Sequence, residues 1–80
     1  MKDTRFKVFN YVKFAKQIIN KRFDLEFEKQ RHFGLRDLAK IIGVSSSTLS
    51  RAMNGKKVDL ETGILICRWI GKEINDFVIA

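Results

Sequence analysis

Apolar residues recur with helical spacing along most of the chain. From Val8 onward they stand three or four positions apart, at Val8, Tyr11, Val12, Ala15, Ile18, Ile19 and Phe23. This spacing predicts a long helix with one apolar face, and the opposite face carries Lys13, Lys16, Gln17, Asn20 and Lys21. Residues Thr4 to Val8 also fit an extended start. Three phenylalanines fall off the predicted face, and some of them are expected to cover another surface: Phe6, Phe9 and Phe14.

The segment from Phe23 to Phe33 fits two structures. It either continues the first helix or forms an extended connection, and Phe33-Gly34 then breaks the pattern. Its three acids alternate too closely to share one helix face, so we expect all of them to face solvent: Asp24, Glu26 and Glu28.

Two short helices follow with a tight joint between them. The first is predicted over Leu35 to Ile42, and the second runs from Ser46 to Met53. Gly43 suits the left-handed position after a helix end, and the Ser45 hydroxyl is a good N-cap. The inward positions of the two helices are Leu35, Leu38, Ala39, Ile42, Leu49, Ala52 and Met53.

The C-terminal part predicts two further helices. Asn54-Gly55 signals a turn, and Asp59 caps a helix from Leu60 to Ile70 that Gly71 ends. Its expected inward face holds Leu60, Ile64, Cys67 and Ile70. Asn75 caps a final turn, Asp76 to Ile79. The prediction is therefore a single all-α, five-helix domain over residues 1–80, with an N-terminal helix and connection (1–33), a helix-turn-helix (35–53) and C-terminal helices (59–79).

Four spaced positions favour a helix-turn-helix over two unrelated helices. Ala39 is small where the second helix crosses, Gly43 makes the corner, Val44 fills it and Leu49 anchors the second helix inside. A joint of three residues is too short for an antiparallel pair and holds the helices at a steep angle. In this motif the second helix offers its outer face to the DNA major groove.

The charge distribution favours a polyanionic partner. The net charge is +7, with seven Lys or Arg and one acid in residues 1–22, five and one in 34–58, and two and four in 59–80. A basic patch on a small domain is typical of nucleic-acid binding, although it also serves solubility.

The residue types on the second motif helix suit a close approach to bases. Ser46, Ser47 and Ser50 are short donors and acceptors, and Arg51 can pair bidentately with a guanine edge. The alternative is that the serines are solvated first-turn residues. Lys56 and Lys57 after the helix, and Arg36 and Lys40 on the preceding one, are candidates for phosphate contacts or simply solvated.

Residues 35–79 resemble the phage-repressor-like helix-turn-helix family, also called lambda-repressor-like or Cro/XRE. The segment reads "LRDLAKIIGVSSSTLSRAMNGKKVDLETGILICRWIGKEINDFVI". The resemblance implies a compact four- or five-helix domain that binds operator DNA as a dimer and regulates transcription. It places Ser46, Ser47 and Arg51 at base-contacting positions. Three others match positions that touch the sugar-phosphate backbone: Ser45, Asn54 and Lys56. At the start of the first motif helix the family often has a polar residue that binds a phosphate. This chain has Leu35 there, and Arg36 is expected to make the phosphate contact instead.

Leu65 and Trp69 stand four apart and suggest an apolar surface patch. With Phe77 they are candidates for a two-fold dimer contact, because exposed apolar patches often mark interfaces. The alternative is that the N-terminal segment folds back over them.

Catalysis, metal binding and membrane insertion find no support in the sequence. Cys67 is the single cysteine and His32 the single histidine, and neither has a partner at ligand spacing. No nucleophile motif or phosphate loop is present, so no cofactor is expected. The absence of a signal peptide and of a long apolar run predicts a cytoplasmic, nucleoid-associated protein.

The sequence thus predicts a sequence-specific double-stranded DNA-binding regulator, a repressor that binds a palindromic operator as a homodimer. Three alternatives stay open: an antitoxin whose N-terminal segment grips a protein toxin, an interaction module without DNA binding, and a single-strand or RNA binder that uses the N-terminal aromatics.

Overall fold

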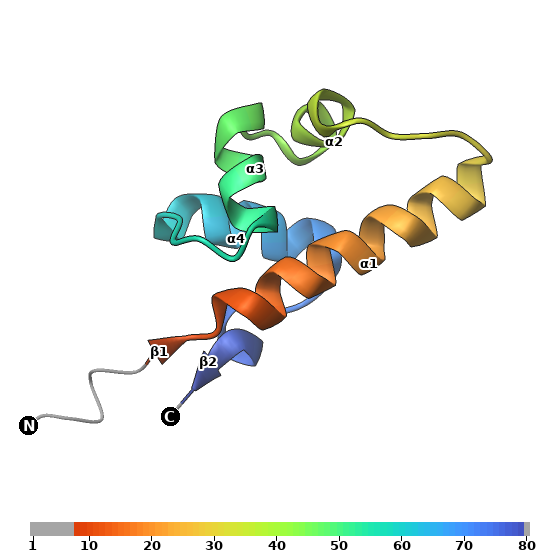
Figure 1. Cartoon of the computed structure of the whole chain (residues 1–80). Coiled ribbons are helices and arrows are strands. Elements are labelled where there is room, and N and C mark those ends of the chain that lie inside the picture. Colours follow the sequence, from red (N-terminus) through yellow and green to blue (C-terminus); the bar gives the residue numbers. More distant parts are fainter. Residues whose placement is uncertain (1–7, 80) are drawn as a thin grey trace, which may run out of the picture.

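The computed structural model describes residues 8–79, and this part of the chain holds four α-helices (Figure 1). The elements follow in the order β1 (Val8–Phe9), α1 (Tyr11–Lys29), α2 (Leu35–Ile42), α3 (Ser46–Met53), α4 (Leu60–Ile70), the 3₁₀ turn η1 (Ile74–Phe77) and β2 (Val78–Ile79). The prediction of a helical fold is confirmed, and the count of five helices is wrong because the last turn is a 3₁₀ turn followed by a strand.

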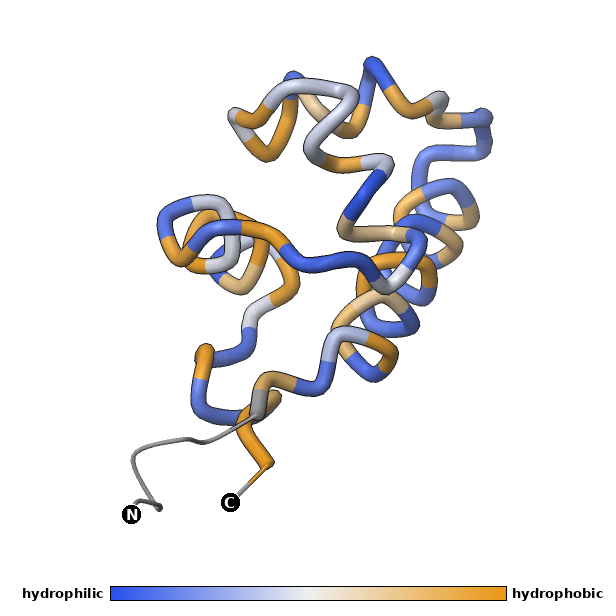
Figure 2. The backbone as a smooth tube through the Cα atoms, turned by 60° about the vertical axis from the view of Figure 1, so that its left-hand side comes forward, coloured by the Kyte–Doolittle hydropathy of each residue, from blue (hydrophilic) through white to orange (hydrophobic). Residues whose placement is uncertain are grey.

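Helix α1 is the longest element and continues through the acidic segment. The Asn10 side chain caps its start, with Oδ1 accepting from the Lys13 backbone N–H at 3.0 Å. The helix ends at Lys29, and Gln30 takes a left-handed conformation with φ 56°. Residues up to Lys29 are therefore helical, and only the next few form a connection to α2. Hydrophobic and hydrophilic residues alternate along α1 (Figure 2).

The buried face of α1 differs from the predicted one. Phe14, Ala15 and Ile18 are buried, whereas Val12 and Phe23, which we expected inside, are exposed. The reason is an aromatic cluster that Phe14 forms with Phe9 and Phe77. The Phe14 ring lies 5.2 Å from the Phe9 ring and 5.1 Å from the Phe77 ring, centroid to centroid, at edge-on angles.

The two ends of the described part of the chain meet in a small antiparallel sheet. Val8 pairs with Ile79 and Phe9 with Val78, and the Asn10 N–H donates to the Phe77 carbonyl at 2.6 Å. The predicted helix Asp76 to Ile79 is therefore wrong, and β-branched residues at its end favour the strand instead.

The start of the final turn also differs from the prediction. Glu73 is its N-cap in place of Asn75, and the Asp76 carboxylate accepts from the Glu73 N–H at 2.9 Å. The expectations for residues 4–7, including Phe6, lie outside the described residues.

Helix α4 is also rotated from its expected orientation. Its buried residues are Thr62, Gly63, Ile66 and Cys67. Leu60 is 67% exposed and Ile64 is 42% exposed, although we expected both inside. The close packing of η1 explains the rotation. A Cβ at position 63 would lie 3.2 Å from Ile74 Cδ1, so the glycine lets η1 approach this face of α4.

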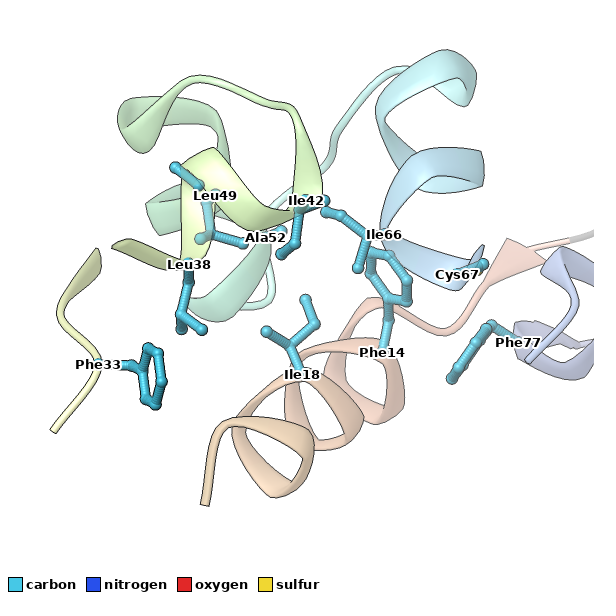
Figure 3. Close-up of a cluster of buried hydrophobic side chains, with 11 residues drawn as sticks. Phe14, Ile18, Phe33, Leu38, Ile42, Leu49, Ala52, Ile66, Cys67 and Phe77 are labelled. Atoms are coloured by element: carbon cyan, nitrogen blue, oxygen red, sulfur yellow. The ribbon is translucent and has the colours of Figure 1, made fainter. Parts of the chain in front are cut away.

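One hydrophobic cluster joins all the helices (Figure 3). Its side chains come from α1, α2, α3, α4, η1 and the connection before α2. They are Phe14, Ile18, Phe33, Leu38, Ala39, Ile42, Leu49, Ala52, Ile66, Cys67 and Phe77. The cluster lies beneath α2 and α3 and holds them against α1 and α4.

The Glu26 carboxylate ties the end of α1 to the connection before α2. It accepts from the Phe33 backbone N–H at 2.8 Å and lies 2.9 Å from His32 Nδ1 and 3.4 Å from Arg22 Nε. The expectation that Glu26 is simply solvated is therefore wrong. The hydrogen bond from Phe33, with the nearby His32 and Arg22, holds the pKa of this carboxyl below its ordinary value of 4.5.

Candidate nucleic-acid interface

Helices α2 and α3 meet at a three-residue corner. Gly43 has φ 93°, and both its N–H and that of Val44 donate to the Ala39 carbonyl, at 2.8 and 3.0 Å. Ala39 and Leu49 are buried and Val44 is half-buried. All four motif residues therefore occupy the positions that the sequence pattern predicts for a helix-turn-helix.

The start of α3 is capped by its own serine. Ser45 Oγ accepts from the Thr48 backbone N–H at 3.2 Å and lies 2.7 Å from Thr48 Oγ1. The prediction of Ser45 as the N-cap is confirmed. Its hydroxyl is engaged within the protein, and its carbonyl accepts from the Leu49 N–H at 3.0 Å, so its backbone N–H is the group that can meet an outside acceptor.

The outer face of α3 presents polar side chains. Ser47 and Arg51, one turn apart, are exposed, and Ser46 and Ser50 are half-buried beside them. Leu49 on the opposite face is fully buried. The four candidate base-contacting residues thus share the side of the helix that faces away from the core.

Arg51 lies along the loop between α3 and α4. Its Nη2 donates to the Lys57 carbonyl at 3.3 Å, and the side chain forms one wall of a cleft of about 480 Å³. The cleft is lined by Thr48, Arg51, Lys57, Val58, Asp59 and Thr62. A single hydrogen bond at an exposed site holds the guanidinium loosely, so it can leave the loop for another acceptor.

Cationic side chains lie on both sides of α3. Arg36 and Lys40 are exposed on α2 and line, with Ser46, a shallow groove of about 210 Å³. Lys56 and Lys57 are exposed in the mostly hydrophilic loop after α3 (Figure 2). The candidate phosphate contacts therefore bracket the helix.

Asn54 closes the last turn of α3. Its side-chain nitrogen donates to the Ser50 carbonyl at 2.8 Å, and the residue is exposed. Like Ser45, it combines a capping role with a position at the edge of the exposed face.

The candidate dimer residues do not gather on the surface. Phe77 is buried in the aromatic cluster, and Leu65 and Trp69 are half-buried against the core. The rotation of α4 turns this pair inward. An apolar patch of these three residues is therefore absent.

One cationic residue near α3 is missing from the sequence-based set. Lys16 on α1 lines a cleft of about 430 Å³ with Val12, Ile19, Met53 and Asn54 among its neighbours. Helical spacing placed it on a solvent face, and only the packing of α1 beside the turn after α3 brings it to this region. No local signal in the sequence reveals the contact.

The described residues show no other candidate chemistry. Among residues 8–79, no three His, Cys, Asp or Glu side chains gather as a metal site, and no helix has the length and apolarity to cross a membrane. Burial, with a smaller contribution from Asp76, raises the pKa of the Cys67 thiol to about 11, as suits a packing residue and not a nucleophile.

Comparison with known proteins gives one family. The family model "Sigma-54, DNA binding domain" matches residues 4–74, nearly the whole chain. No curated protein and no solved structure matches.

The resemblance to the phage-repressor-like family is therefore wrong. The segment that carried the resemblance contains the four corner residues of a helix-turn-helix. These residues meet a packing requirement common to such motifs, and they do not separate one helix-turn-helix family from another. The prediction of DNA binding in transcription agrees with the family that matches. Domains of this kind are typically non-enzymatic. The chain belongs to the sigma-54 DNA-binding domain family.

Proposed function

We propose that the protein binds double-stranded DNA sequence-specifically by placing α3 in the major groove. The observation that carries the proposal is the outer face of α3, where hydroxyls and one arginine stand over a fully apolar inner face. An α-helix fits the major groove, where each base pair presents a distinct pattern of donors and acceptors.

The roles within this face follow from side-chain length. Ser46, Ser47 and Ser50 do not obstruct a close approach and exchange hydrogen bonds with base edges or phosphates. Arg51 exchanges its bond to the Lys57 carbonyl for a guanine O6 and N7, a bidentate contact that discriminates by about 1–3 kcal/mol.

The flanking cations position the helix without reading sequence. Arg36 and Lys40 contact phosphates on one side, and Lys56 and Lys57 contact them on the other. The backbone N–H of Ser45 and the side-chain amide of Asn54, at the two ends of α3, donate to further phosphates and complete the register. Each phosphate that is neutralised releases counterions, so the affinity falls as salt rises.

Regulation follows from the position of the bound site. A protein that occupies the major groove within a promoter excludes other proteins from the same groove. Repression is the effect that we propose where the bound site overlaps a promoter.

The test is selection of bound duplexes from a random pool, with Arg51→Ala beside the wild type. We expect a consensus in which one position prefers guanine, and that preference relaxes in the variant with a loss of about 10- to 100-fold in affinity for the consensus. Arg68→Ala, at an exposed arginine of α4, is the matched control and keeps the consensus.

The competing outcomes are distinct. A wild-type protein that enriches no sequence, or whose binding does not weaken with salt, removes the proposed function. An Arg51→Ala protein with an unaltered consensus shows that another side chain reads the bases.

A further inference from the structure

A stripe of exposed apolar side chains runs the length of α1. Val12 is 75% exposed, Phe23 is 63% exposed and Phe27 is 80% exposed, and the half-buried Ile19 lies between them on the same side of the helix. At 100° per residue, these four positions fall within a sector of about 80°. We name this set, Val12, Ile19, Phe23 and Phe27, the α1 stripe. Large apolar side chains gathered along one exposed face mark an interaction surface.

The charges of α1 are divided between its two halves. Residues 11–22 contain four Lys or Arg and no acid, and residues 23–28 contain three acids and no Lys or Arg. This order opposes the helix macrodipole, which favours acids near the N-terminus and cations near the C-terminus. The stability of α1 by itself therefore does not explain the division.

We propose that the α1 stripe is the contact surface of a two-fold homodimer in which two copies of α1 run antiparallel. Antiparallel pairing places the basic half of each helix beside the acidic half of the other. With Lys16 opposite Asp24 of the second copy, Val12 lies near Phe27 of that copy, so charges and apolar residues align in one register. Within residues 8–79 neither Lys16 nor Asp24 has an ion-pair partner.

A cleft at the N-terminal end of the stripe provides a receiving site. It has a volume of about 430 Å³ and lies between α1 and the turn after α3, lined by Val12, Ala15, Lys16, Ile19, Met53, Asn54 and Gly55. In the antiparallel register this is the place that Phe27 of the second copy reaches. Each copy then offers one projecting phenylalanine and one cleft, as an isologous interface requires.

The area available fits a modest but specific dimer. The distal end of α1 projects beyond the other helices (Figure 1), so a second helix can approach it. A phenylalanine buries about 150–250 Å², and two from each copy supply about half of the roughly 1,200 Å² at the lower limit of standard interfaces. The cleft and the charged flanks supply the rest. Weak, transient contacts occupy this lower end of the size range, and we expect a dissociation constant on the order of micromolar.

The first test is the mass of the protein in solution, without DNA, by sedimentation equilibrium. We expect a monomer–dimer equilibrium that Phe27→Asp weakens by at least about 30-fold. Leu60→Asp is the matched control, since Leu60 is also a large apolar side chain exposed to 67% but lies on α4, and it leaves the equilibrium unchanged. A wild type that stays monomeric at about 100 μM, well above that dissociation constant, overturns the dimer, and an unaffected Phe27→Asp overturns this surface.

Charge exchange tests the antiparallel register. Lys16→Glu and Asp24→Lys each place like charges opposite one another and weaken the dimer, by about 3- to 10-fold for an exposed pair repeated twice. A mixture of the two variants restores it as a heterodimer, because both contacts then join opposite charges. A mixture that associates no better than either variant alone overturns the register. Since no DNA is present, failure here leaves the proposed DNA binding untouched.

Discussion

A single carboxylate controls the path from α1 to α2. Glu26 accepts from the Phe33 backbone N–H and lies beside His32 and Arg22, so three groups from two segments converge on it. Phe33 is buried beside Leu38 in the core (Figure 3). The bond to its N–H therefore fixes where the connection enters the core, one step before the helix-turn-helix begins.

This arrangement predicts a pH-dependent stability. The pKa of Glu26 is lowered in the folded protein, so its contribution is fully present above the unfolded value near 4.5 and is lost as the pH falls through the folded pKa. Glu26→Gln lacks that contribution at every pH. We expect the variant to be less stable than the wild type at pH 7, with the difference narrowing below pH 4.5.

Urea unfolding between pH 7 and pH 3, followed by circular dichroism, measures this difference. Glu28→Gln is the control, because Glu28 is exposed on the same helix and does not contact Phe33. An equal response of the two variants at all pH values would contradict the role of Glu26.

At the scale of elements, the corner between α2 and α3 depends on one backbone conformation. Gly43 has φ 93°, where a Cβ is strained, yet no atom lies within 4 Å of the position that its Cβ would take. The requirement for glycine is therefore conformational and not steric crowding by neighbours.

Gly43→Ala is accordingly expected to destabilise the fold by about 1 kcal/mol, the usual cost of a side chain at a left-handed C-cap. Gly34→Ala is the matched control at the other end of α2. Its φ is −73° and the nearest atom to a new Cβ is 3.9 Å away, so we expect a change within about 0.5 kcal/mol. Thermal unfolding of both variants measures the difference, and equal losses would show that φ is not what selects glycine at 43.

Local signals explain which elements could be predicted from the sequence. Gly43, Ser45 and Gly71 mark helix ends through their own backbone or side chain, and the structure has the ends of α2, the start of α3 and the end of α4 at the predicted residues. Long-range contacts explain the errors. The orientation of α1 follows from the contact between Phe14 and Phe77, which are far apart in sequence. The orientation of α4 follows from Ile74, which packs against Gly63.

In the candidate site, too, local signals could be read from the sequence and long-range contacts could not. The outer face of α3 follows from helical periodicity, so the places of Ser46, Ser47, Ser50 and Arg51 could be anticipated. The neighbourhood of Lys16 depends on how α1 crosses the turn after α3, which no local pattern encodes.

At the scale of the whole molecule, one core connects the proposed DNA-reading helix to the proposed dimer helix. Phe14 and Ile18 of α1 are fully buried in the same cluster as Leu49 and Ala52 of α3. The inner face of α1 thus supports α3, while its outer face carries the α1 stripe. Substitutions on the inner face should therefore lower the stability of the fold, and substitutions on the outer face should weaken association of the two copies.

Phe14→Ala and Phe27→Ala test this separation on one helix. Truncating a buried phenylalanine costs about 3–5 kcal/mol, and a domain of 80 residues has only about 4–12 kcal/mol of stability in total. Phe14→Ala should therefore leave a substantial unfolded population, visible as lost helical circular dichroism and a transition at much lower denaturant.

Phe27 is 80% exposed, so in dilute solution Phe27→Ala should change the unfolding free energy by no more than about 0.5 kcal/mol. Because mass action stabilises an associated state, a larger loss for Phe27→Ala that appears only at high protein concentration would agree with the dimer. The same loss at every concentration would mean that Phe27 packs within its own chain, contrary to the structure.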